Sequence, residues 1–206
     1  GTCKNRVFVT TFASNIARLE SIIMAGQEAG RKIVLTGRSM WRVTEAAKQS
    51  GYLQDAPEFL SDRDAMDVPR DKLLIIGTGC QGEPRAALSR IARGEHNHIR
   101  FSPDDTVIFA SRMIPGNKSR IGYTHNQLVQ RGVEVITPGE HFIHVSGHPA
   151  RDELTEMYRM IRPKIAVPVH GEARHIAEHA KLAKSLQVPE TVCPRNGSVV
   201  LLREGE

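Results

Sequence analysis

The stretch KLLIIGTGCQGEPRAALSRIAR, residues 72–93, carries the pattern that decides the fold. Its apolar run at residues 72–77 is typical of a buried strand, the glycines that follow predict a tight turn, and residues 84–93 have the spacing of a helix. The same order of a short β-branched run and an amphipathic stretch recurs along the chain. The sequence therefore predicts an α/β fold, with a mostly parallel sheet flanked by helices.

The predicted elements alternate almost without exception. The strands are predicted at residues 6–10, 32–36, 72–77, 106–110, 133–136, 164–169 and 198–202, and the helices at residues 15–29, 39–49, 84–93, 119–131, 151–161 and 173–185. Residues 52–70 read as an irregular surface connection. A Pro-Gly turn near residues 137–140 separates the first five strands from a tail rich in histidine.

Composition narrows the class of protein. The 206 residues, 40% of them hydrophobic, suffice for one large domain or two small ones with a real core. A formal net charge of +5 fits an anionic partner such as nucleic acid. No apolar run approaches the roughly 20 residues that cross a bilayer, and the start lacks a signal peptide, so we expect a cytoplasmic protein. Cys3, Cys80 and Cys193 lie far apart and are expected to be reduced thiols.

Gly77, Gly79 and Gly82 formally match the G-x-G-x-x-G pattern of dinucleotide sites. The context argues against such a site, because Glu83-Pro84 follows the last glycine and the next strand ends in a serine instead of an acid. The other interpretation is a tight turn that lets backbone amides approach a ligand, which could be an anion.

Ser14 and Asn15 lie between the first predicted strand and helix, where unpaired backbone N–H groups and the helix dipole favour a phosphate. The alternative is that Ser14 only caps the helix. The loops at residues 11–15, 77–82 and 111–117 all follow parallel strands. Because ligands bind at the carboxyl ends of such strands, these loops are expected to line one cleft.

The tail contains IHVSGH, residues 143–148, in which His144, Ser146 and His148 are two apart. An extended backbone would point all three to one side. A hydroxyl between two imidazoles suits a phosphate, and either imidazole could act as a general acid or base. Two surface histidines without a function remain the alternative.

PVHGEARHIAEHA, residues 168–180, holds three further histidines. His175, Glu178 and His179 form an H-x-x-E-H metalloprotease pattern, but their context favours solvated residues on a helix face. His170 is expected to project from the end of a buried strand. One histidine cannot hold zinc, so any other ligands must come from elsewhere.

Six motifs, in order, resemble the ribonuclease J family of the metallo-β-lactamase/β-CASP superfamily: TTFASNIARL, GRSM, GTGCQGEPRAALSRIA, IPGN, HVSGH and PVHGEARH. The resemblance implies that residues 1–137 are most of a β-CASP domain. It implies that residues 138–206 are the C-terminal part of the metallo-β-lactamase domain into which the β-CASP domain is inserted, a partial αβ segment. Such enzymes degrade RNA exonucleolytically from a 5′-monophosphate end and also endonucleolytically.

The resemblance also implies roles for single residues. His148 would contact the substrate and donate a proton to the leaving oxygen, and His170 would be a zinc ligand. Cys80 stands where the family usually has serine, which would weaken any phosphate contact there. The implied substrate-binding residues are Ser14, Asn15, His144, Val145, Ser146, Gly147 and His148.

The family's H-x-H-x-D-H motif does not occur in this sequence. The resemblance implies that most ligands of a two-zinc site, whose ions would activate water, lie in an N-terminal half outside these residues. The chain alone is therefore expected to be a poor nuclease, and the full-length protein to be a homo-oligomer. The alternative function is a non-catalytic module for RNA binding or assembly.

Overall fold

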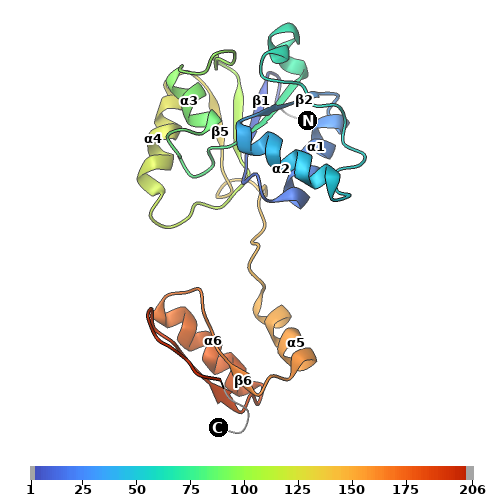
Figure 1. The fold of residues 1–206 in the computed structure, drawn as a ribbon. Helices are drawn as coiled ribbons and strands as arrows, with labels where there is room; N and C mark the ends of the chain where they lie inside the picture. Colours follow the sequence, from blue (N-terminus) through green and yellow to red (C-terminus); the bar gives the residue numbers. More distant parts are fainter. Residues whose placement is uncertain (1–2, 203–206) are drawn as a thin grey trace. The chain divides into compact units, whose positions relative to one another are not determined.

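The structure is a computed structural model that describes residues 3–202. It divides into two compact units, Gly1–Val145 (unit 1) and Ser146–Glu206 (unit 2), shown in Figure 1. The division falls inside the HVSGH motif. In the range described, no helix is both long and apolar enough to span a lipid bilayer.

Unit 1 is built on one five-stranded sheet in which every neighbouring pair of strands is parallel. The strand order is β2-β3-β1-β4-β5. The strands are β1 (Val7–Thr10), β2 (Lys32–Thr36), β3 (Leu73–Gly77), β4 (Thr106–Phe109) and β5 (Glu134–Ile136). The α-helices are α1 (Ile16–Glu28), α2 (Arg38–Gln49), α3 (Ala87–Arg93) and α4 (Lys118–Val129), with short 3₁₀ helices η1 (Asp64–Asp67) and η2 (Arg70–Lys72). The predicted α/β class is confirmed.

Two apolar clusters cover the two faces of the sheet, because successive side chains of a strand point to opposite faces. Phe8 of β1 packs with side chains of α3 and α4, whereas its neighbours Val7 and Val9 pack with side chains of α1 and α2. Figure 1 shows these two pairs of helices on either side of the strands. A parallel sheet that is covered on both faces explains why its strands are continuous apolar runs.

A buried ion pair lies beside the amino end of β4. Asp105 accepts hydrogen bonds from Arg6 at 2.6 Å and from Arg70 at 2.5 Å, and its side chain is 1% exposed. Arg6 also donates to the carbonyl of Arg100. The carboxylate therefore ties the segments that precede β1, β3 and β4 to one another at the end of the sheet opposite the predicted cleft.

Unit 2 is a smaller αβ unit. It contains α5 (Arg151–Ile161), β6 (Ile165–Ala166), α6 (Ala173–Ser185) and β7 (Glu190–Thr191), and β6 pairs with β7 in parallel. The apolar cluster of this unit contains Ala166, Ala183 and Val188, with Tyr158 packed against them.

Several local predictions were wrong. The strand predicted at residues 198–202 does not form in the described chain, and the strand predicted at residues 164–169 shortens to β6. Helix α3 begins at Ala87, because the N–H of Ala86 bonds to the carbonyl of Glu83 in a turn. The residue that caps α1 is Asn15, whose side chain accepts a hydrogen bond from the N–H of Arg18 at 3.1 Å, and not Ser14.

Candidate functional site

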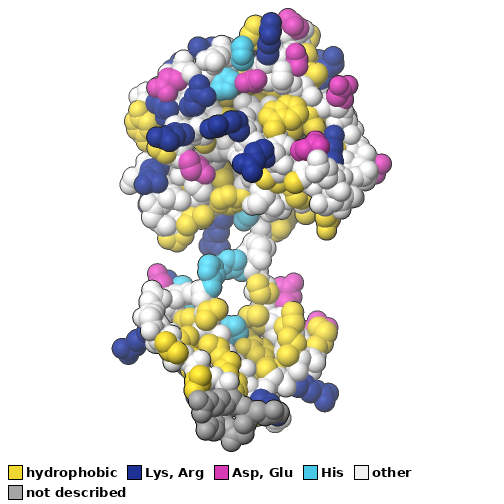
Figure 2. All heavy atoms as spheres, in the orientation of Figure 1, with side chains coloured by type: hydrophobic (Ala, Val, Ile, Leu, Met, Phe, Trp, Pro, Cys, Tyr) yellow, Lys and Arg dark blue, Asp and Glu magenta, His cyan; other side chains and the backbone are white. Residues whose placement is uncertain are grey.

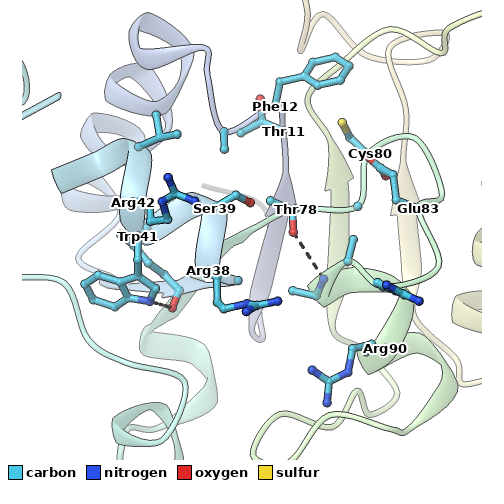
Figure 3. A pocket seen from close by; sticks show the side chains of 18 of the residues that line it. Thr11, Phe12, Arg38, Ser39, Trp41, Arg42, Thr78, Cys80, Glu83 and Arg90 are labelled. Atoms are coloured by element: carbon cyan, nitrogen blue, oxygen red, sulfur yellow. Dashed lines mark hydrogen bonds between the residues drawn. The ribbon is translucent and has the colours of Figure 1, made fainter. Parts of the chain in front are cut away.

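The carboxyl ends of β1, β2 and β3 open onto a cavity of about 1080 Å³ in unit 1, drawn in Figure 3. Residues that follow each of these strands line it, namely Thr11–Ser14, Gly37–Ser39 and Thr78–Cys80. Two of the three predicted loops therefore contribute, and the loop after β2 replaces the third. The predicted third loop, residues 111–117, is not part of this lining.

The glycine-rich turn after β3 is fixed by the side chain of Gln81. The Gln81 amide donates to the carbonyl of Arg112 at 2.9 Å and to the hydroxyl of Ser111 at 3.4 Å. Its oxygen accepts from the N–H of Ile114 at 2.9 Å and from the side chain of Asn117 at 3.2 Å. Gln81 thus joins the turn to the loop that carries the IPGN motif.

The tight turn is also imposed by Gly82. Its φ of +70° lies in the left-handed region, and a Cβ there would lie 2.6 Å from the backbone carbon of Arg120. Beside it, the thiol of Cys80 is 2% exposed, and burial raises its pKa. Cys80 is therefore a buried, protonated thiol at the wall of the cavity.

Ser14 and Asn15 are both exposed at the start of α1, and Ser14 lines the cavity. The side chain of Arg18, one turn further, donates to the carbonyls of Ile143 at 3.1 Å and Val145 at 3.4 Å. This arginine therefore holds the first half of the HVSGH segment against the start of α1.

His144 lies in that segment and is half-buried. Burial and the positive charge of Arg18 lower the pKa of its imidazole, and the charge of Arg112 acts in the same direction. Its Nδ1 atom is buried and has no hydrogen-bond partner among the residues described. A neutral imidazole contacts a phosphate as a hydrogen-bond donor instead of a cation.

In unit 2 the structure brings together the two histidines to which the sequence assigned catalysis and metal binding. The rings of His148 and His170 lie edge to face, with centroids 5.9 Å apart and an interplanar angle of 62°. The backbone N–H of His148 donates to the hydroxyl of Ser146 at 3.1 Å. His170 has a φ of +61°, in the left-handed region that few residues with a side chain adopt.

The route by which His170 is placed differs from the expectation. The sequence predicted that a buried strand leads directly to it, but β6 ends at Ala166 and Val169 is 65% exposed. The left-handed backbone at His170, just before α6, sets the direction of its side chain.

The H-x-x-E-H residues on α6 are occupied with other partners. Nε2 of His179 lies 2.9 Å from the hydroxyl of Tyr158, and Nδ1 of His175 accepts from the N–H of Glu172 at 3.2 Å. Glu178 pairs with Lys181 at 2.6 Å. His179 was expected to be solvated but is half-buried. Within residues 3–202, no group of three or more His, Cys, Asp or Glu side chains could hold a metal ion.

Sequence reasoning missed several residues that line the cavity, among them Arg38, Trp41 and Arg42 on α2 and His96. Nδ1 of His96 accepts from the N–H of Ile99 at 3.3 Å, which leaves its proton on Nε2, facing Asp62 at 3.3 Å. The Gly-Arg-Ser sequence directly after β2 could have indicated that this loop lines the cavity.

Comparison with known proteins agrees with the fold and the motifs. Residues 4–128 match the family "Ribonuclease J, beta-CASP domain", and residues 132–192 match "Zn-dependent metallo-hydrolase RNA specificity domain". The first match covers more than half of the chain. The chain belongs to the ribonuclease J family.

Curated relatives cover nearly the whole chain. It is 45% identical over 202 residues to a ribonuclease J of Sinorhizobium meliloti, covering 98% of this chain and 36% of the relative. It is 37% identical over 204 residues to that of Thermus thermophilus, covering 98% and 36%, and 41% identical over 209 residues to that of Corynebacterium glutamicum, covering 100% and 29%. The chain therefore spans about a third of the length of these relatives.

Proposed function

We propose that this chain is part of a zinc-dependent ribonuclease that acts on RNA both as a 5′–3′ exonuclease and as an endonuclease. Family membership supports an RNA-processing nuclease. The observation that carries the proposal is the pair formed by His148 and His170, with centroids 5.9 Å apart, inside the segment that matches a zinc-dependent metallo-hydrolase domain.

His170 suits one position in a zinc site. Its ring is exposed, and neither of its nitrogens is engaged in a hydrogen bond within the described part of the chain. The further ligands would come from residues other than those described, in an N-terminal half of a longer polypeptide. When bound there, a pair of zinc ions would activate water and stabilise charge on the phosphodiester.

His148 is proposed as the general acid. It would hold a proton on its imidazole and donate it to the leaving oxygen of the RNA, while Ser146 fixes the backbone N–H of His148. Other contacts to RNA are proposed for the exposed Ser14, Asn15, Val145 and Gly147 and for the half-buried His144. Ser14 and Asn15 would hold a 5′-monophosphate, because they lie at a helix start.

The proposal assigns residues 1–137 to a β-CASP domain and residues 138–206 to the C-terminal part of a metallo-β-lactamase domain. It also includes a cytoplasmic location and a homo-oligomeric full-length protein. The exposed apolar side chains of unit 2 are consistent with a lactamase part that needs its complementary half.

The test reconstitutes the chain with the N-terminal half of its protein and zinc, and measures turnover of 5′-monophosphorylated RNA. We expect His148→Ala to lower kcat by about 100-fold or more at unchanged zinc content, as for loss of a general acid. We expect His170→Ala to lower both turnover and bound zinc, measured by mass spectrometry.

The matched control is His175→Ala, which removes an exposed histidine of α6 and should retain zinc and turnover. Full activity of the His148 and His170 variants would contradict the proposal. RNA binding without turnover in every reconstituted combination would assign the chain to a non-catalytic module for RNA binding or assembly.

A further inference from the structure

The cavity of unit 1 has a basic lining that the roles proposed above leave unexplained. Arg38 and Arg42 reach it from α2, Arg85 reaches it from the turn before α3, and Arg90 reaches it from α3 itself. Figure 3 shows the side chains of Arg38 and Arg90 in the space between these two helices. In Figure 2, basic side chains gather on the visible face of unit 1.

The acidic residues of the lining do not neutralise these arginines. The carboxylate of Glu83 accepts the N–H of Gln81 at 2.9 Å, and that of Asp62 faces His96. Among the residues that the structure describes, the side chains of Arg38, Arg42 and Arg85 form no hydrogen bond and no ion pair. Four arginines against two acids give the cavity a positive potential that suits phosphate groups.

The backbone at the start of α2 points to the same chemistry. The first N–H groups of a helix have no partner inside it, and Gly37 provides no side chain to cap them. In addition, Thr11 is 1% exposed and lines the cavity, and its hydroxyl has no partner in the described chain. Among the residues described, the cavity lining thus contains unpaired hydrogen-bond donors, the first N–H groups of α2 and the Thr11 hydroxyl, in addition to the free guanidinium groups.

Trp41 supplies an aromatic surface at the same wall. Its indole N–H donates to the carbonyl of Leu35 at 3.1 Å, which fixes the ring, and the side chain is 39% exposed. Nucleic acid bases stack on such rings without regard to sequence. A fixed indole and free guanidinium groups in the lining of one cavity supply the two kinds of contact, stacking and charge, that a base and its phosphates need.

We propose that this cavity binds a nucleotide of single-stranded RNA, with the base on Trp41 and the phosphates on Arg38, Arg42 and Arg85. The inference rests on the proposed function, because the occupant is the RNA substrate. The cavity also reaches Ser14, so one strand can occupy both places. Its volume of about 1080 Å³ is slightly larger than that of most ligand pockets and admits a nucleotide.

Trp41 is the single tryptophan of the chain, so its fluorescence reports on this cavity alone. The experiment titrates the 206-residue chain with an oligouridylate of roughly ten nucleotides. Binding is followed by Trp41 emission and, independently, by the anisotropy of the same RNA labelled at its 3′ end. We expect saturable quenching with the same midpoint as the anisotropy change.

The variant Arg38→Ala/Arg42→Ala keeps the tryptophan and removes two charges. We expect its Kd to rise by about tenfold or more. We also expect the slope of log K against log salt to become shallower by about 0.7 for each phosphate that the variant no longer neutralises. The control Lys32→Ala/Lys72→Ala removes two charges from exposed positions at the amino ends of β2 and β3, and should leave both quantities nearly unchanged.

The two readouts separate the possible failures. An anisotropy change without quenching, or an equal effect of the two double variants, would overturn the cavity assignment and leave the proposed function intact. Equal quenching by uridine monophosphate at the same concentration would overturn the proposal that the occupant is single-stranded RNA. It would assign the cavity to a free nucleotide. The absence of any RNA binding, together with inactivity of the reconstituted protein, would overturn both proposals.

Discussion

The two units differ in how much of their apolar surface they bury. Unit 1 covers both faces of its sheet, and side chains such as Phe8 and Ile75 are 0% exposed. In its described residues, unit 2 has two strands of two residues each and an apolar cluster of three buried side chains. Its helix α5 has no buried residue and exposes Met157, Met160 and Ile161. Figure 2 shows apolar side chains gathered on the visible face of unit 2.

The same alternation of strands and helices thus gives a unit that buries its apolar faces by itself and a unit that leaves an apolar face exposed. A parallel sheet of five strands with helices on both sides is complete, since each face is covered by this chain's own residues. Sheets of two short strands are marginal without further packing. An exposed apolar face on which several large side chains gather is typical of a surface that other protein residues cover.

The largest expected effect comes from the core of unit 1. Phe8→Ala should lower the free energy of unfolding of unit 1 by about 3–5 kcal/mol, because it removes a fully buried ring and leaves a cavity. The measurement is urea unfolding followed by the fluorescence of Trp41, which lies in unit 1. The matched variant Val188→Ala, in the core of unit 2, should leave this transition in place. A shift of equal size in both variants would show that the units unfold as one.

A smaller effect is expected from acid. His125 packs edge to face with Phe109 at 4.4 Å, and burial lowers its pKa. Burial also lowers the pKa of His96, although Asp62 opposes it. The unfolded chain, with histidine pKa values near ~6.5, binds these protons more readily than the folded chain. Their contribution to stability is therefore present above that pH and is lost as the pH falls through the folded pKa.

The measurement is the Tm of unit 1 from Trp41 emission between neutral and mildly acidic pH. We expect His125→Phe to make the Tm fall less steeply toward acid, because a phenyl ring takes up no proton. His141→Gln, at an exposed position, is the control and should keep the wild-type slope. An unchanged slope in His125→Phe would show that this histidine does not link unit 1 to pH.

The smallest expected effect is on the exposed face of unit 2. Met160 is 69% exposed, so Met160→Gln should change stability by less than about 0.5 kcal/mol in thermal unfolding followed by circular dichroism. The same variant should lower self-association in sedimentation velocity, since it breaks an apolar patch. A loss of stability as large as that of Phe8→Ala would mean that the side chain belongs to a core.

Three elements were predicted to the residue, and packing does not explain which, since α5 has no buried residue. Strand β2 and helices α5 and α6 have the expected bounds, because their limits are set by local signals such as Gly37 after β2 and the turn after α6. The Ser198 to Leu202 stretch has the composition of a strand, but strand formation needs a partner strand, and Val199 is 92% exposed. The local sequence pattern does not show whether a partner strand is present.

For the cavity, the sequence predicted the loops after β1 and β3 but not the residues that depend on neighbours in space. The rings of His148 and His170 lie 5.9 Å apart, and the roles assigned to these two residues stay predictions. The cavity residues Arg38 and Trp41 were missed, because nothing in the sequence shows that α2 faces the glycine-rich turn. Their position depends on the strand order, in which β3 lies between β2 and β1.

The four hydrogen bonds between the Gln81 side chain and residues 111–117 have a consequence for ligand binding. Both polar atoms of this side chain are saturated, so the glycine-rich turn and the loop after β4 form one stiff rim. A ligand that binds there finds the backbone amides of the turn already fixed in position. Its binding therefore restricts little further chain motion. Such preorganisation lowers the entropic cost of association, and here it depends on Gln81, a side chain that is almost wholly enclosed.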